Sequence, residues 1–198
     1  FLDNHGLLQV TGQPRWRTVV SGSHSYVGPL TRPFRDRIHL GHGVERVIRG
    51  ADRVEIVLED GSAHGFDHVV IAAHADQALA MLAEPSAEEV ELLGQWRYSV
   101  NDTWLHTDLA LMPRRRAAWA SWNYLMTDAS RESASLTYHL NRLQGLDADR
   151  EYLVTLNPEN EPVPGSVIRR MSYSHPIFTR QSVETQNELP RINGRNRT

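Results

Sequence analysis

The chain has 198 residues, of which 40% are hydrophobic, a formal net charge of −3 and no cysteine. This composition is typical of a globular protein with a sizeable core; it excludes disulfides and thiolate chemistry and argues against a general nucleic-acid binder. All 21 basic residues are arginines, which excludes a Schiff base or a lysine general base within this sequence. No apolar run reaches the length of a membrane span and residues 1–10 lack a signal-peptide pattern, so we expect a cytoplasmic protein without a transmembrane segment.

The first element in chain order is a strand-like apolar run over residues 17–20, which stops at the turn Ser21-Gly22-Ser23. Such a turn lets a ligand approach the backbone, and it is equally common as a purely structural turn. Ser23 or Ser25 can cap a short helix that ends near Pro33. We expect this helix to carry its apolar side chains inward, namely Tyr26, Val27, Leu30 and Phe34.

Residues 38–74 form a β-rich block. The segments 44–50 and 53–61 are strand-like, and Asp60-Gly61 suits the turn of a tight hairpin. The run 69–73 is apolar without alternation, as in a strand that is covered on both faces in a parallel sheet. The block therefore predicts a β-meander followed by a strand that is part of an α/β sheet.

The segment 75–98 contains two helices, separated by Pro85, and the second can be capped by Ser86 with Glu88 and Glu89 in its first turn. Four segments between residues 99 and 158 alternate polar and apolar residues, which predicts an antiparallel sheet rich in aromatic side chains. A proline-rich connection follows at 157–166, and we expect residues 173–198 to be mostly irregular.

Several of these stretches resemble a known family. "WRTVVSGSHSYV", "IHLGHGVERVIR" and "VEIVLEDGSAHGFDHVVIAAHADQALAML", in this order, resemble the middle of a flavin-containing amine oxidase-type oxidoreductase. "NDTWLHTDLALMPRRRAAWASWNY", "LTYHLNRLQGL", "YLVTLNP" and "SHPIF" are more similar to a bacterial subgroup of predicted NAD/FAD-binding proteins. The resemblance implies an α/β and α+β fold. It comprises a partial FAD-binding, Rossmann-like domain over residues 13–82, rejoined by 183–198, and an antiparallel-sheet substrate domain over 83–182.

The resemblance also implies where FAD would contact the chain. The family's Gly-Gly-Ser turn, which runs beside the flavin, falls on Ser21-Gly22-Ser23, with Ser21 in place of the first glycine. Val44 matches the position whose backbone reads the adenine end of FAD. Small residues match those at the end of the strand that passes near the dinucleotide, namely Ala72 and Ala73.

Three departures from the family's pattern concern the cofactor and the chemistry. The fingerprint G-x-G-x-x-G, which holds the pyrophosphate, does not occur in the 198 residues, and the family's closing glycine-rich segment has no counterpart. We therefore expect a central piece of a longer enzyme, which alone retains FAD weakly or not at all and is inactive. Many amine oxidases of this type place a lysine near flavin N5, so amine oxidation by that arrangement is not expected here.

Other polar patterns have a functional and a structural interpretation. The pairs His39/His42 and His64/His68 have metal-like spacing but lack a convergent carboxylate, so no metal site is predicted. The arginine-rich stretch 113–119 can contact an anionic group or form a solvated turn. Three residues can line a substrate pocket above the flavin or simply pack in the core, namely Trp122, Asn123 and Tyr138.

The sequence thus predicts part of an FAD-dependent oxidoreductase that transfers a hydride from a small-molecule substrate to flavin. The aromatic sheet favours an apolar or lipid-like substrate. The alternative is a non-catalytic binding module with an aromatic-lined groove. The pattern assigns no catalytic residue, electron acceptor or oligomeric state.

Overall fold

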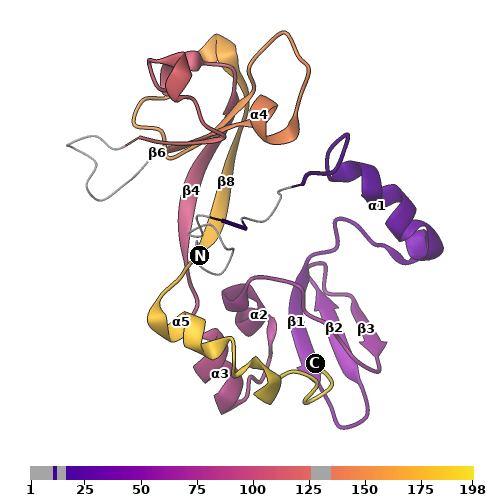
Figure 1. Ribbon diagram of the computed structural model, residues 1–198. Helices are drawn as coiled ribbons and strands as arrows, with labels where there is room; N and C mark the ends of the chain where they lie inside the picture. Colours follow the sequence, from indigo (N-terminus) through magenta and orange to yellow (C-terminus); the bar gives the residue numbers. More distant parts are fainter. Residues whose placement is uncertain (1–10, 13–16, 126–134) are drawn as a thin grey trace. The chain divides into compact units, whose positions relative to one another are not determined.

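A computed structural model describes residues 11–12, 17–125 and 135–198 (Figure 1). The chain divides into two compact units: the first unit comprises residues 1–36 and 102–172, and the second unit comprises 37–101 and 173–198. Both units combine helices with antiparallel strands, as predicted for the fold class. The assignment of residues 13–82 and 83–182 to an FAD-binding and a substrate domain stays a prediction.

The second unit contains a small antiparallel sheet of the order β1-β2-β3, with β1 (Val44–Arg49), β2 (Val54–Leu58) and β3 (Ala63–Phe66). The predicted hairpin turn joins β2 to β3. Asp60 Oδ1 accepts a hydrogen bond from the backbone N–H of Ser62 at 2.9 Å, and Gly61 has a φ of 82°. A left-handed φ of this kind is easily adopted only by glycine, which explains the turn's position.

Two helices follow the small sheet, α2 (Ala75–Met81) and α3 (Ala87–Leu93). The predicted cap of α3 is confirmed: Ser86 Oγ accepts from the N–H of Glu89, and the Glu89 carboxylate accepts from the N–H of Ser86. The same carboxylate pairs with Arg49 of β1, and both side chains are buried. The core of the unit lies between β1, β2 and α2 and contains Val47, Val54 and Leu82, with Val44, Val69, Ile71 and Met81 packed against it.

The prediction of a buried parallel strand over residues 69–73 is wrong. This segment is not part of a sheet in the structure: the N–H of Val69 bonds to the carbonyl of Arg197, and Val70 is 90% exposed. Within the described residues, parallel pairing is limited to an isolated bridge between Val47 and Leu82. A continuous apolar run is buried only where neighbouring elements cover it, and the sequence of the run does not determine which elements lie beside it.

The large sheet has the order β5-β6-β7-β4-β8. Its strands are β4 (Arg97–His106), β5 (Trp122–Leu125), β6 (Ser135–His139), β7 (Leu153–Leu156) and β8 (Val167–Ile177), of which β4 and β8 contribute residues to both units. The four predicted strands of this sheet are confirmed. The expectation that residues 173–198 are mostly irregular is wrong, because β8 extends to Ile177 and is followed by α5 (Arg180–Thr185).

The more buried face of β6 is its polar one. Ser135, Thr137 and His139 are buried, whereas Leu136 and Tyr138 between them are only half-buried. A short helix, α4 (Leu140–Gln144), follows β6 and ends at Gly145, which adopts a left-handed φ of 62°. The alternation predicted from sequence is present, but the buried face is the one that carries hydroxyl and imidazole groups.

Helix α1 (His24–Thr31) begins after Ser23, as predicted, but none of its residues is buried. The four residues expected to point inward are exposed, so that expectation is wrong: Tyr26, Val27, Leu30 and Phe34. A helical pattern shows which residues share a face, not what covers that face. Residues 17–20 do not form a strand. The remaining turns are 3-10 segments: η1 (Arg32–Arg37), η2 (Leu109–Leu111), η3 (Arg116–Ala118), η4 (Pro164–Ser166) and η5 (Leu189–Arg191).

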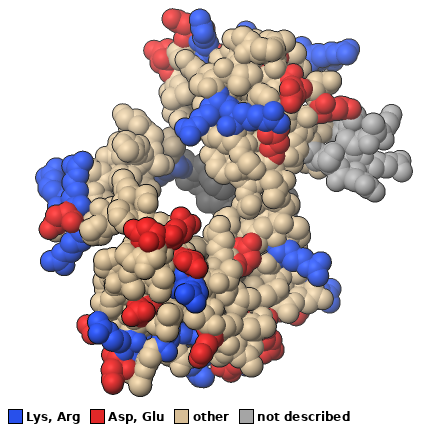
Figure 2. All heavy atoms as spheres, turned by 180° about the vertical axis from the view of Figure 1, so that it is seen from behind, with Lys and Arg blue, Asp and Glu red and all other residues tan. Residues whose placement is uncertain are grey.

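The surface in Figure 2 carries acidic and basic side chains interspersed with one another. In the part of the chain that the structure describes, no helix combines the length and apolar character needed to cross a membrane.

Candidate functional site

A cleft with a volume of about 760 Å³ lies in the first unit, where β5 begins and α4 ends. Ligand pockets commonly have volumes of roughly 300–1,000 Å³. Trp122 is 43% exposed at this cleft. The lining residues are Arg17, Thr18, Ser121, Trp122, Arg142, Leu143, Gln144 and Gly145. The cleft thus combines an indole and a leucine side chain with two guanidinium groups.

Two of the three predicted substrate residues lie together. Trp122 and Tyr138 are directly opposite in the pairing of β5 with β6, and their rings pack edge to face with centroids 6.1 Å apart. Burial raises the pKa of the Tyr138 phenol above its usual value. Trp122 therefore has an aromatic support on the neighbouring strand while part of its ring stays accessible.

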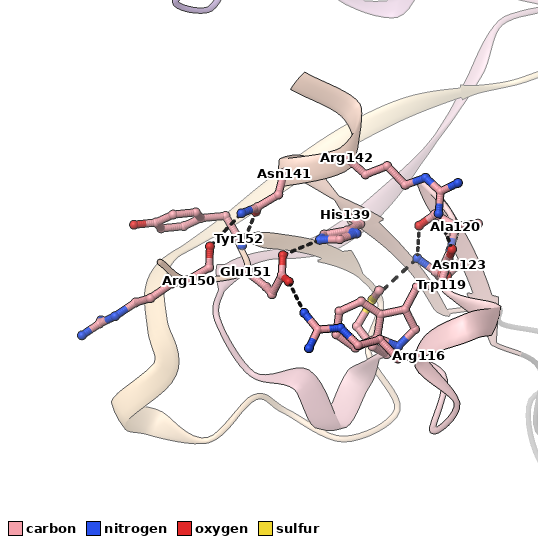
Figure 3. Close-up of polar contacts among 11 residues, drawn as sticks. Arg116, Trp119, Ala120, Asn123, His139, Asn141, Arg142, Arg150, Glu151 and Tyr152 are labelled. Carbon is pink, nitrogen blue, oxygen red and sulfur yellow. Dashed lines mark hydrogen bonds and ion pairs between the residues drawn. The ribbon is translucent and has the colours of Figure 1, made fainter. Parts of the chain in front are cut away.

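Asn123, the third predicted residue, is buried, and its amide bonds to the protein. Its Nδ2 donates to the carbonyl of Ala120 at 2.7 Å, and its Oδ1 accepts from the N–H of Ala120 at 2.9 Å (Figure 3). Nδ2 also lies 3.3 Å from the carbonyl of Thr137. These bonds fix the start of β5, and a contact of Asn123 with substrate stays a prediction.

Arg142 is held at the edge of the cleft by the backbone. Its Nη1 donates to the carbonyl of Trp119 at 2.6 Å, and the indole N–H of Trp119 donates to the carbonyl of Pro113 at 2.8 Å. Figure 3 shows Arg142 extending from α4 toward the Trp119–Ala120 segment. The position of the guanidinium is thus set by a neighbouring loop and does not depend on an acidic side chain.

A second polar group lies next to Trp119 and was not identified from sequence. His139 Nε2 is 2.7 Å from one oxygen of Glu151, and Arg116 donates to the other oxygen at 2.7 Å (Figure 3). The hydrogen bond with His139 is the main reason why the pKa of Glu151 lies below its usual range, despite partial burial. The ring of His139 packs edge to face on the indole of Trp119 with ring centroids 5.5 Å apart, and the Arg116 guanidinium carbon lies 4.9 Å from the centroid of the indole.

His139 Nδ1 is buried and has no hydrogen-bond partner among the described residues. The sequence contains only a weak signal for the cluster of His139 and Glu151. Alternation placed His139 with Thr137 on one face of a strand, but Glu151 comes from a different segment. A contact between two segments of this kind cannot be read from local periodicity.

A chain of hydrogen bonds crosses the buried face of the large sheet. The backbone N–H of Asp108 donates to His106 Nδ1 at 3.1 Å, so this nitrogen carries a lone pair and the ring proton is on Nε2. Nε2 then donates to Thr155 Oγ1 at 2.7 Å, which leaves the Thr155 hydroxyl to donate to Thr137 Oγ1 at 2.9 Å. Burial lowers the pKa of His106, which favours the neutral ring that this arrangement requires.

The turn predicted to lie beside the flavin has two residues with a left-handed backbone. Gly22 has a φ of 78°, and a Cβ placed on it would meet nothing within 4 Å. Ser21 has a φ of 65°, so it also adopts the left-handed conformation. Ser25 Oγ donates to the carbonyl of Gly22 at 2.7 Å and stabilises the turn. The chain at Gly22 therefore has open space beside its backbone.

The other predicted cofactor residues belong to the second unit. Val44 is the first residue of β1 and packs against the core of the small sheet. Ala72 and Ala73 are exposed and precede α2. Their contacts with FAD stay predictions.

The histidine pairs with metal-like spacing show no metal-binding geometry in the described ranges, where no group of three or more His, Asp or Glu side chains could hold a metal ion. His39 and His42 pack edge to face with ring centroids 5.8 Å apart.

Comparison with solved structures defines the fold class. The CLA-producing fatty acid isomerase from P. acnes matches with a TM-score of 0.52 and 12% identity, covering 79% of this chain and 41% of the isomerase. An HpxO variant from Klebsiella pneumoniae, complexed with FAD, matches with a TM-score of 0.34 and 23% identity, covering 71% of this chain and 31% of HpxO. The chain thus shares the fold of the matched part of the isomerase and spans less than half of the isomerase's length.

Comparison with protein families then shows to which family the chain belongs. Residues 19–137 match the family of flavin containing amine oxidoreductases, and the chain belongs to this family. The resemblance noted from the sequence is confirmed. No curated protein matches the sequence.

Proposed function

We propose that the chain is part of an FAD-dependent oxidoreductase whose substrate lies in the cleft at Trp122. One observation carries this proposal: the family match over residues 19–137 includes both the turn at Ser21–Ser23 and strand β5. Arg17 and Thr18, which line the cleft, are only a few residues from the same turn in the sequence. The substrate cleft and the flavin turn would therefore share one segment of chain.

The residues that would hold FAD are Gly22, Ser23, Val44, Ala72 and Ala73. The open, left-handed backbone at Gly22 fits a cofactor that approaches the chain closely. Bound FAD supplies an acceptor for a hydride from the substrate. The protein's own part is to hold and orient that substrate, with Trp122 as the aromatic wall of the cleft and Tyr138 packed against Trp122. Catalytic residues and the electron acceptor are not assigned.

An apolar or lipid-like substrate agrees with the lining of the cleft. The exposed part of Trp122 and the side chain of Leu143 provide apolar surface, and Tyr138 supports the indole. The P. acnes isomerase acts, by its name, on a fatty acid, although at 12% identity the likeness concerns the fold alone. The absence of lysine from the sequence argues against the amine-oxidising arrangement of the family.

The flavin content of the protein tests the proposal. We expect the 198-residue chain alone to purify without FAD, because it lacks the pyrophosphate-binding fingerprint. Expressed with the coding sequence that flanks it and purified gently with added FAD, the protein should be yellow. Flavin released by denaturation is then measured by absorbance. A flavin-free protein under these conditions would instead favour the non-catalytic binding module with an aromatic-lined groove.

A matched pair of variants, made in the protein that is expressed with its flanking coding sequence, tests the flavin turn itself. Gly22→Asn keeps a residue that tolerates the left-handed conformation but places a side chain in the open space, so flavin occupancy should fall. Gly61→Asn is the control, because Gly61 has a φ of 82° and equally open surroundings in the hairpin turn. Equal flavin content in the two variants would remove Gly22 from the cofactor site.

A further inference from the structure

We infer that the cleft at Trp122 recognises an aliphatic carboxylate, with Arg142 and Arg17 binding the carboxylate group and Trp122 and Leu143 contacting the hydrocarbon part. The inference rests on the proposed function only in taking this cleft as the place of the substrate. It adds the chemical class of the substrate and the residues that select it.

The first argument is uncompensated charge. Arg17 and Arg142 line the cleft, and no aspartate or glutamate is among its described lining residues. Neither arginine forms an ion pair in the described part of the chain, whereas Arg49, Arg116, Arg170 and Arg191 each pair with a carboxylate. Two guanidinium groups beside one cavity repel a cationic ligand and favour an anionic one.

The second argument is the fixed position of Arg142. Its bond to the carbonyl of Trp119 uses one of the five N–H donors of a guanidinium, so others remain for a ligand. A planar guanidinium that is already held in place binds a carboxylate with two parallel hydrogen bonds and loses little conformational entropy in doing so. The loop at Trp119 is itself anchored, because the indole N–H of Trp119 donates to the carbonyl of Pro113, so the exposed Arg142 guanidinium is bonded to a loop that has its own internal contact.

The third argument is the apolar part of the lining. Trp122 is 43% exposed although it is a large aromatic residue, and its accessible surface lies at the same cleft as Leu143. A small inorganic anion would leave this surface in contact with water, whereas a hydrocarbon chain would cover it. Charge and apolar surface together thus point to one molecule with an anionic end and an aliphatic body.

Binding of matched eight-carbon compounds tests the inference. Octanoate, octan-1-ol and octylammonium are titrated into the 198-residue chain by isothermal titration calorimetry at neutral pH and low salt. We expect octanoate to bind at least tenfold more tightly than octan-1-ol, octylammonium not to bind measurably, and octanoate binding to weaken as salt increases. Octanoate that binds no more tightly than octan-1-ol, or fails to bind, overturns the inference.

Two arginine variants locate the binding. Arg142→Met keeps an unbranched apolar stem and removes the charge, so the affinity for octanoate should fall at least tenfold while that for octan-1-ol stays unchanged. Arg114→Met is the control, because Arg114 is exposed and does not line the cleft. Equal losses in both variants, or none in Arg142→Met, would refute the role of Arg142. The flavin content measured above is independent of these results, so failure of the carboxylate site and failure of the oxidoreductase proposal can be told apart.

Discussion

Replacing Thr155 with valine tests the buried hydrogen-bond chain of the large sheet. Thr155 is 0% exposed, and its hydroxyl lies 2.7 Å from His106 Nε2 and 2.9 Å from Thr137 Oγ1. Valine has nearly the same shape but no hydroxyl. The substitution therefore leaves the packing in place and removes the acceptor of a buried imidazole N–H.

The size of the effect follows from these contacts. A buried polar group that loses its partner costs about 1–3 kcal/mol. His106 is fully buried, so water cannot replace the lost acceptor. Thr137 loses a donor but can still donate to the carbonyl of Leu111 at 3.4 Å, which makes its loss the smaller one. We therefore expect the free energy of unfolding to fall by about 1–3 kcal/mol.

Urea unfolding followed by circular dichroism measures this difference. Thr107→Val is the matched control, because Thr107 is only half-buried and its hydroxyl makes no hydrogen bond to the described residues. That variant should stay within about 0.5 kcal/mol of the original chain. If Thr155→Val were equally neutral, or if NMR placed the His106 ring proton on Nδ1, the proposed direction of the hydrogen bonds would be wrong.

Three further outcomes are expected from other parts of the structure. Burial lowers the pKa of His106, whereas an unfolded histidine titrates near about 6.5, so below that pH the native state binds fewer protons than the unfolded state. As the pH decreases below about 6.5, the free energy of unfolding should therefore fall by up to about 1.4 kcal/mol per pH unit. His106→Gln should abolish this slope in urea titrations across pH. Arg49→Met leaves the carboxylate of Glu89, whose side chain is 5% exposed, without its partner; thermal and urea unfolding should show a loss of about 3–5 kcal/mol that Arg49→Met combined with Glu89→Gln reduces. Gly145→Ala forces a side chain into a φ of 62° at the end of α4 and should cost about 1–2 kcal/mol, whereas Gly165→Ala, at an ordinary φ, should cost little; equal unfolding midpoints for the two variants would contradict this reasoning.

Local signals in the sequence predicted local structure well. The hairpin at Asp60-Gly61 and the cap at Ser86 depend on residues within a few positions of one another, and both are confirmed. Four of the five strands of the large sheet were also predicted, since their alternation is a local pattern. Strand β8 was missed because its pairing partner β4 is distant in the sequence and its residues alternate weakly.

The candidate site was predicted only in part, for a similar reason. Trp122 and Tyr138 were predicted, with Asn123, to line a substrate pocket or to pack in the core, and in the structure their rings pack against each other. Arg142 was not, because its place at the cleft results from the helix that follows β6 and from a bond to a distant backbone carbonyl. Burial of the run 69–73 was predicted from its composition, although burial depends on which strands lie beside it.

The buried polar face of β6 and β7 has a consequence for how the strands align. Thr137 and Thr155 are direct neighbours in the pairing of these strands, and His106 reaches Thr155 from β4. If β7 slipped by two residues, the leucine and valine side chains would still face the same sides, so apolar packing alone would tolerate the error. The hydroxyl groups would then lose their partners in a place that water cannot reach. Two threonines and a histidine therefore stabilise one strand register and destabilise the shifted registers that apolar packing alone would allow.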